Sequence, residues 1–169
     1  MIGVDLAFAT GQVDPPDRLA AWRELVNRVF LPLAITPLAR GDRSGAFRAS
    51  VTGRGLGGVQ VWLIEGSPMS AVRARPHIEA SGDDDYLLAL HVQGSAHGAQ
   101  DGREVTLGPG DFALFDSSRP YSISFTGPGV FRHGWPRARA ARSRRRWHRG
   151  PPGWPGAPGR PRAGRRRGR

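Results

Sequence analysis

The chain of 169 residues contains no cysteine and no lysine. The absence of cysteine excludes disulfide bonds and thiolate-bound metal sites. Long hydrophobic runs are also missing, since no stretch approaches the roughly 20 apolar residues that a membrane-spanning helix needs. The first residues, Met1 to Leu6, lack the basic and then apolar pattern of a secretory signal peptide. We therefore expect a soluble protein of the cytoplasm.

Acidic residues are missing from one end of the chain. Residues 132–169 contain 14 arginines and no Asp or Glu, whereas residues 1–131 carry 11 arginines and all 14 carboxylates, a net charge of −3. The formal net charge of +11 therefore comes from the C-terminal segment alone. Arg, Gly, Pro and Ala make up 32 of its 38 residues, and Val, Ile, Leu, Met and Phe are absent. Such a segment buries too little apolar surface to offset its conformational entropy, so we expect disorder over 132–169.

In the rest of the chain, the periodicity of the apolar residues changes once. Residues 1–16 show no clear period and are expected to form a loose lead-in. An apolar spacing of three and four predicts an amphipathic helix over 17–30, which follows Asp14-Pro15-Pro16 and ends before Pro32. From Ala46 the pattern alternates, which predicts short strands over residues 46–52, 59–64, 69–75, 86–93, 103–107, 112–115 and 121–125. Many short strands between Gly, Pro, Asp and Ser favour an antiparallel barrel or sandwich.

Residues 101–121 give the most specific pattern. They read DGREVTLGPGDFALFDSSRPY, which predicts a turn, a strand, a tight GPGD turn, a second strand and a polar loop closed by RPY. This segment resembles the second half of a cupin-type barrel, and in particular the effector-binding domain of AraC-type transcriptional regulators. Two further segments resemble motifs of that domain, namely the WRE of 22–24 with the FLPL of 30–33, and the SGDDDY of 81–86 before its strand. The resemblance covers residues 17–131.

The resemblance implies a mainly β protein, a cupin-like antiparallel barrel or jelly roll preceded by an amphipathic helix. It implies a barrel that binds a small-molecule effector, helices that mediate homodimerisation, no cofactor and no enzymatic activity. In the family the barrel continues into another strand, helices and a helix-turn-helix module, but here the resemblance stops near Phe131. Arg, Gly, Pro and Ala have GC-rich codons, so we expect that a frameshift near codon 132 truncated the domain. Site-specific DNA binding is then not expected of this chain.

The candidates for the effector site are Trp62, Arg75, Tyr86, His91 and Gln93. His91 and Gln93 share a strand face with apolar residues, and polar groups inside a barrel would hydrogen-bond an effector. The alternative is that this face points to solvent. Trp62 and Tyr86 would stack on a ligand or belong to the core. Arg75 would meet an anionic effector or lie on the surface.

Metal and phosphate binding are not supported by the pattern. Metal-binding cupins use a His-x-His pair and a later histidine, whereas here His91 and His97 are six residues apart and Tyr121 takes the late position. No metal is therefore expected. Gly53–Gly58 precedes a strand rather than a helix, so we interpret it as a flexible hairpin connection and not as a phosphate loop. Asp83–Asp85 lacks the spaced ligands of a calcium loop and is expected to be a solvated turn.

The arginine-rich segment supplies an alternative function. Arginine clusters near tryptophan bind phosphates and stack on unpaired bases. The chain would then be a small nucleic-acid-binding protein with the barrel as a scaffold. The clusters that would make these contacts are Arg144, Arg145, Arg146, Arg165, Arg166 and Arg167.

Overall fold

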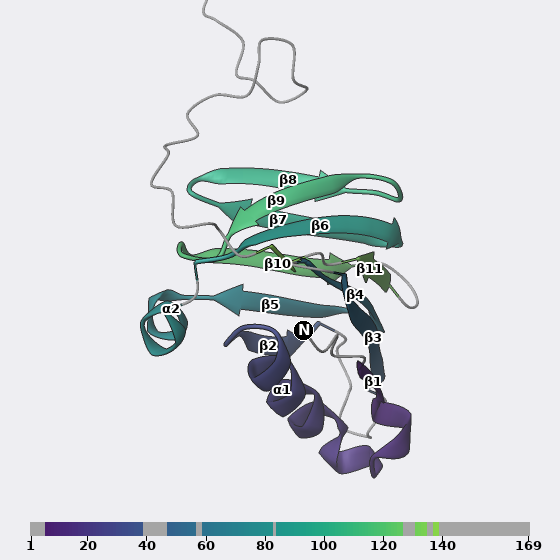
Figure 1. Ribbon diagram of the computed structural model, residues 1–169. Helices are drawn as coiled ribbons and strands as arrows, with labels where there is room; N and C mark the ends of the chain where they lie inside the picture. Colours follow the sequence, from purple (N-terminus) through teal and green to yellow (C-terminus); the bar gives the residue numbers. More distant parts are fainter. Residues whose placement is uncertain are drawn as a thin grey trace, which may run out of the picture.

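The computed structural model describes residues 6–38, 47–56, 59–82, 84–126, 131–134 and 137–138. Most of these residues lie in two antiparallel sheets (Figure 1). Sheet A contains β1 (Leu6–Ala9), β3 (Ala49–Leu56), β4 (Val59–Gly66), β6 (Tyr86–Gln93), β9 (Phe112–Asp116), β11 (Phe131–Gly134) and β12 (Arg137–Ala138). Sheet B contains β2 (Ala34–Pro37), β5 (Met69–Arg73), β7 (Ser95–Gln100), β8 (Arg103–Leu107) and β10 (Tyr121–Thr126).

The strand order brings distant parts of the chain together. Sheet A runs β1–β3–β4, then β11 and β12, which both pair with β4 and with β6, and then β6–β9. Sheet B runs β2–β5–β10–β7–β8. All the described pairings are antiparallel, and the inner faces of the two sheets share one buried core. The predicted mainly β antiparallel architecture with an N-terminal helix is confirmed.

Four short helical segments accompany the strands. They are η1 (Thr10–Gln12), η2 (Pro15–Asp17), α1 (Arg18–Val29) and α2 (Arg75–Ser81). Helix α1 agrees with the predicted helix to within one residue at each end, and it buries Trp22, Leu25 and Val26 against the sheets. No helix in the described ranges is long and apolar enough to cross a membrane.

The core is filled by aromatic rings that lie over glycines. Gly53 of β3 faces Trp62 of β4 in register, and a Cβ atom at Gly53 would come within 2.0 Å of the indole ring. In sheet B a Cβ atom at Gly98 would come within 2.8 Å of the Phe115 ring, which reaches across from sheet A. Glycine at these positions leaves room for the large rings, because a close-packed core has no space for both the ring and an additional Cβ atom. The barrel interior is therefore packed rather than open here.

The segment that carried the strongest resemblance folds as predicted. Asp101 and Gly102 have φ angles of 54° and 72°, as a tight hairpin turn between β7 and β8 requires. The GPGD turn is closed by a hydrogen bond from Gly108 N to Asp111 Oδ2 of 2.9 Å. It is also bound to β6, since His91 N donates to Asp111 O and Gly110 N donates to His91 O, both at 2.8 Å.

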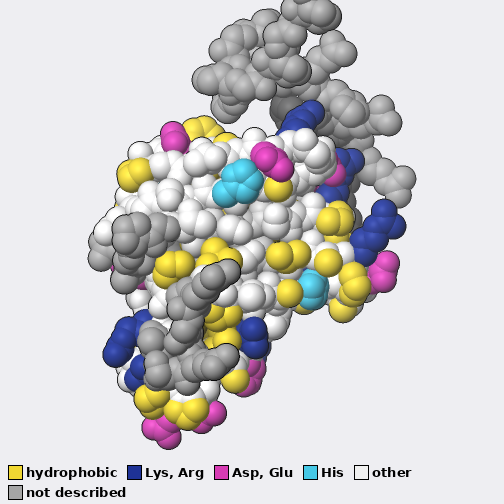
Figure 2. Space-filling model, turned by 180° about the vertical axis from the view of Figure 1, so that it is seen from behind, with side chains coloured by type: hydrophobic (Ala, Val, Ile, Leu, Met, Phe, Trp, Pro, Cys, Tyr) yellow, Lys and Arg dark blue, Asp and Glu magenta, His cyan; other side chains and the backbone are white. Residues whose placement is uncertain are grey.

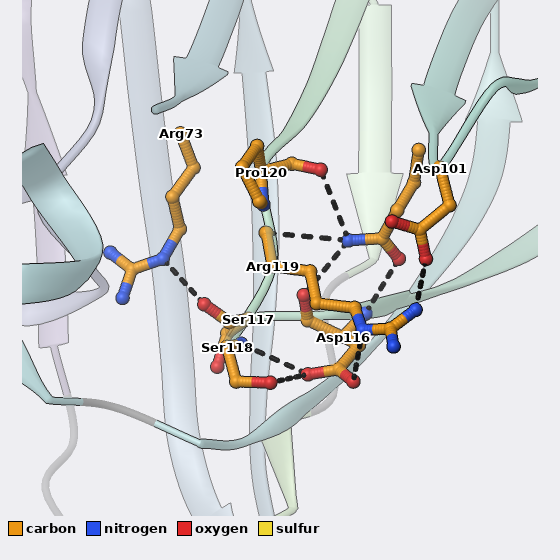
Figure 3. Close-up of polar contacts among 8 residues, drawn as sticks. Arg73, Asp101, Asp116, Ser117, Ser118, Arg119 and Pro120 are labelled. Carbon is orange, nitrogen blue, oxygen red and sulfur yellow. Dashed lines mark hydrogen bonds and ion pairs between the residues drawn. The ribbon is translucent and has the colours of Figure 1, made fainter. Parts of the chain in front are cut away.

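A polar network holds the loop between β9 and β10 (Figure 3). Asp116 Oδ1 accepts hydrogen bonds from Ser118 N and Ser118 Oγ, at 2.9 and 2.6 Å. The Gln100 side chain donates to Asp116 O and accepts from Asp116 N. Arg119 forms an ion pair with Asp101 in the hairpin turn. The DSSRP part of the motif thus closes one end of the barrel, and Tyr121, which follows it, packs in the core against Phe115.

The structure differs from the sequence predictions at the element boundaries. The strand predicted over 69–75 ends at Arg73, and α2 follows, because Pro76 suits the first turn of a helix and Gly82, with φ at 64°, ends it. Gly53–Leu56 belongs to β3 rather than to a flexible connection, since Gly53 makes room for an indole. Residues 57 and 58 of the same prediction lie outside the described residues.

The chain ends of the predicted domain also differ. Part of the predicted loose lead-in forms β1, which pairs with β3, followed by η1 and η2. At the other end, the sequence resemblance stops near Phe131, yet β11 and β12 extend sheet A to Ala138 and pair with both β4 and β6. The expectation that no strand follows Phe131 is therefore wrong. The predicted disorder over 132–169 is wrong for residues 132–134 and 137–138, which lie in β11 and β12. Residues 135–136 and 139–169 of the same prediction lie outside the described residues.

The outer faces of the two sheets have different chemistry. Serine, threonine and histidine occupy most of the outward positions of sheet B, where Val72 and Val105 are also exposed, and the back of the molecule shows hydrophobic groups spread over a largely white surface (Figure 2). More large apolar side chains are exposed on β4, β6 and β9 of sheet A. They are Val61, Leu63, Leu90, Val92, Phe112 and Leu114, with exposed fractions of 36% to 62%.

Candidate functional site

A small cavity lies between α1 and the inner faces of both sheets. Its volume is about 40 Å³, roughly a quarter of the ~150 Å³ apolar cavity known to hold benzene. The wall is almost entirely hydrophobic. It is formed by Trp22, Val26, Phe30, Leu31, Leu33, Ile35, Ile64, Met69, Ala71, Leu87 and Phe125.

Helix α1 forms one wall of this cavity and is held in place by two polar side chains. Arg23 donates from Nε and Nη2 to the carbonyl oxygen of Ile35 in β2, at 2.9 and 2.7 Å. Asn27 Oδ1 accepts a hydrogen bond of 2.7 Å from Leu33 N. Both contacts join α1 to the segment that enters sheet B. The other walls are strands that are held by continuous ladders of backbone hydrogen bonds.

Two tryptophans, Trp22 and Trp62, contribute buried indole N–H donors to the barrel interior. Trp22 is 1% exposed, lines the cavity and stacks on Phe8 of β1 with ring centroids 6.5 Å apart. Trp62 is 2% exposed and meets the edge of Phe30 at 5.0 Å, but it is not among the residues that line the cavity. Within the described part of the chain, neither indole Nε1–H finds a hydrogen-bond acceptor. Buried donors without an acceptor are rare in proteins and call for an explanation.

The structure separates the five residues proposed for the effector site. Trp62 and His91 lie inside the barrel, where His91 is fully buried and stacks on Phe125 at 6.4 Å. Tyr86 is 40% exposed on the outer face of β6. Arg75 lies exposed at the first position of α2, and Gln93 is exposed at the end of β6. Only Trp62 and His91 are therefore buried inside the barrel, and none of the five predicted residues lines the cavity beneath α1.

His91 is neutral inside the barrel. Burial lowers its pKa from the ordinary value of 6.5, against smaller raising effects from a backbone hydrogen bond at Gly94 and from the charge of Asp111. An unfolded chain takes up a proton near pH 6.5, and the folded chain does so only at lower pH. The contribution of neutral His91 to the free energy of unfolding is thus fully present above pH 6.5. It falls as the pH drops from 6.5 toward the lowered pKa of the folded state.

Arg73 is an internal charge that the sequence analysis missed. Its side chain is fully buried, and its guanidinium donates to Ser117 O at 2.8 Å (Figure 3). It also donates to Pro32 O at 3.0 Å and to Ser81 Oγ at 2.8 Å. It joins β5 to α2, to the turn after β9 and to the segment after α1. The alternation of the strand could have predicted that Arg73 faces the core, because Met69 and Ala71 of the same strand both do so.

Metal-binding groups do not gather in the part of the chain that the structure describes. No cluster of three or more His, Asp or Glu side chains with metal-binding geometry occurs there. Asp85, expected in a solvated turn, is 2% exposed, and its carbonyl oxygen accepts a hydrogen bond from Ser117 N at 2.9 Å. Asp84 is exposed, as expected, and Asp83 lies outside the described residues.

Comparison with known proteins points to one family. Residues 22–133 match the family model of the AraC-binding-like domain. The chain is 33% identical over 119 residues to a Bacillus sp. (strain OxB-1) protein named for its place in the nit 5′ region, covering 70% of this chain and 45% of that one. It is 28% identical over 127 residues to the transcriptional activator NphR of Rhodococcus sp., covering 75% of this chain and 36% of NphR.

A solved structure supports the same fold. The AraC-like transcriptional activator CuxR matches with a TM-score of 0.67 and 18% identity, over 80% of this chain and 46% of CuxR. At that identity the likeness concerns the fold alone. The chain spans less than half the length of the curated relatives that it matches.

Proposed function

This chain belongs to the AraC-binding-like domain family, and from that membership we propose that it is the effector-sensing domain of an AraC-type regulator, with its effector site in the cavity beneath α1. The observation that carries the proposal is the cavity itself, a small, partly open apolar space between α1 and the two sheets. Ligand sites are commonly concave and mostly apolar. A signal would leave the site through α1, which forms one wall of the cavity and the start of the domain.

A thermal-shift screen with small molecules tests this proposal. A ligand that binds only the folded chain raises its stability, by about 2.7 kcal/mol at a hundredfold excess over Kd. Ala71→Leu fills the cavity and is expected to abolish the shift, because Ala71 lines it. Val72→Leu is the matched control, since Val72 is 37% exposed on the opposite face of the same strand. Compounds that stabilise both variants equally bind elsewhere and contradict the proposed site.

We also propose that the chain pairs with a second copy through the outer face of sheet A. Leu63, Leu90 and Phe112 are exposed and lie in one row across sheet A, in which Leu90 and Phe112 are neighbours and Gly134 of β11 lies between Leu63 and Leu90. Contiguous exposed apolar surface commonly marks an interaction site. Light scattering should show a dimer that Phe112→Glu dissociates, whereas Val105→Glu on β8 of sheet B should leave it intact.

The charge of residues 139–169 favours nucleic-acid binding as a second candidate function. Polycations bind nucleic acid with an affinity that falls steeply with salt concentration. Replacing the six clustered arginines at 144–146 and 165–167 with glutamine should remove salt-dependent DNA binding from the full chain. If the six-fold variant binds DNA as tightly as the wild type, the tail is not the binding element.

The reading frame of the tail bears on the same question. The family match ends at residue 133, and residues 139–169 contain no Val, Ile, Leu, Met or Phe. We propose that these residues were translated from a shifted frame and that site-specific DNA recognition is not their role. On this proposal the chain is a regulator domain without catalytic activity.

A further inference from the structure

We infer that the cavity beneath α1 takes a neutral, largely apolar small molecule whose single hydrogen-bond acceptor meets the indole Nε1–H of Trp22. This inference rests on the proposed effector site and adds the chemical class of its ligand. It makes Trp22 a specificity-determining residue.

The lining excludes charged ligands. All eleven residues of the wall have apolar or aromatic side chains, and no carboxylate or guanidinium is among them. Arg73, the fully buried cation of the barrel, donates to Ser117, Pro32 and Ser81 instead. An ion placed in this cavity would lose its hydration without gaining a partner, which is far more costly than burying a neutral group.

Trp22 is the residue of this wall whose side chain carries an N–H group. Its Nε1–H is buried, and no acceptor in the described ranges takes its hydrogen bond. A buried donor left without an acceptor costs free energy that a ligand oxygen or nitrogen recovers. A neutral molecule with one acceptor on an apolar frame therefore fits both the wall and the donor. Trp62 offers the same donor, but it lies outside the cavity wall and serves as the internal control.

Helix α1 is the wall that yields when a ligand enters. The space of about 40 Å³ is too small for a ring-sized molecule, which needs on the order of 150 Å³. The strands are fixed in their sheets, whereas α1 is joined to β2 and the preceding segment by Arg23 and Asn27. Ligand entry thus displaces α1 outward, and occupancy of the cavity is read out in the position of the helix.

Three probes of similar shape test the ligand class on the full chain. Acetophenone is neutral with one acceptor, cumene is neutral without one, and benzoate is charged. Acetophenone and cumene should bind, and benzoate should not. On saturation with acetophenone the indole ¹H–¹⁵N resonance of Trp22 should shift downfield, and that of Trp62 should not. Hydrogen exchange should change over residues 18–29. None of these measurements requires an altered protein to fold.

Substitution of the two tryptophans gives a second test. Trp22→Phe keeps an aromatic ring but removes the donor. The preference for acetophenone over cumene should fall by about 2- to 10-fold relative to the wild type, the range of one net hydrogen bond. Trp62→Phe should leave that preference unchanged.

Three outcomes would overturn the inference while leaving the effector site in place. They are benzoate binding as tightly as acetophenone, an unmoved Trp22 resonance, and unchanged exchange over 18–29 in the bound state. A screen in which no compound of any charge stabilises the chain would instead remove the proposed function itself. The two failures are therefore distinguishable.

Discussion

Replacement of Arg73 by methionine should destabilise the domain more than any surface change. The guanidinium makes three hydrogen bonds of 2.8 to 3.0 Å to groups from three separate segments. Hydrogen bonds from a charged donor contribute about 1.5–3 kcal/mol each, and breaking a buried charged network typically costs about 3–5 kcal/mol in total. Methionine fills much of the vacated volume but removes the guanidinium donors to Ser117 O, Pro32 O and Ser81 Oγ. We therefore expect a loss of about 3–5 kcal/mol in the free energy of unfolding.

Urea denaturation followed by circular dichroism measures this loss. For a domain of this size the midpoint of thermal unfolding should also fall by about 10–20 °C. Arg75→Met is the matched control, because Arg75 is exposed only two residues away and its loss should change the stability by less than about 0.5 kcal/mol. If Arg73→Met unfolds within 1 kcal/mol of the wild type, the network around the guanidinium does not hold this end of the barrel together.

Three further predictions follow from the core and the tail. Gly53→Ala should cost about 1–3 kcal/mol of stability, because its Cβ would overlap the Trp62 ring, whereas Gly11→Ala, with open space around it, should be close to neutral in urea titrations. The free energy of unfolding should fall as the pH drops from 7.5 to 5.5, because burial lowers the pKa of His91. His91→Gln should make this fall less steep, whereas His97→Gln should not, since His97 is exposed. Equal slopes in the wild type and both variants would exclude His91 as the cause. Sequencing of the gene should find, in another frame downstream of codon 138, apolar helices and a helix-turn-helix module. Stop codons early in both other frames would leave the tail as a genuine part of the protein.

The sequence predicts the fold because the helical and the strand spacings of its apolar residues are both regular. Spacings of three and four define α1, and alternation defines the strands whose inner positions make up the core. The element boundaries were predicted less well where a residue is compatible with both a loop and a strand. Gly53 suggests a loop in the sequence, but its role depends on the indole of Trp62, which lies opposite it on the next strand. Such a cross-strand contact is invisible without the register.

The site could be predicted only in part for a related reason. Alternation along β6 places His91 on the inner face, and the structure puts it there. Gln93 has the same parity but lies at the strand end, where the inner face has already opened to solvent. The cavity itself arises where one helix meets five strands that are scattered along the chain. No local pattern encodes such a meeting, because each contributing residue is an ordinary core residue in its own segment.

Two of the motifs that resemble the family have different structural roles. The motif of residues 101–121 contributes nothing to the cavity wall, and its polar residues Asp101, Asp116 and Arg119 close the far turn together with Gln100, which precedes the motif. The motif around α1 does line the cavity, through Trp22 and the segment from Phe30 to Leu33. The rest of the wall, including Met69 and Ala71, lies outside both motifs. Family membership therefore accounts for the scaffold and for the helix that covers the cavity, whereas residues outside both motifs complete the cavity wall.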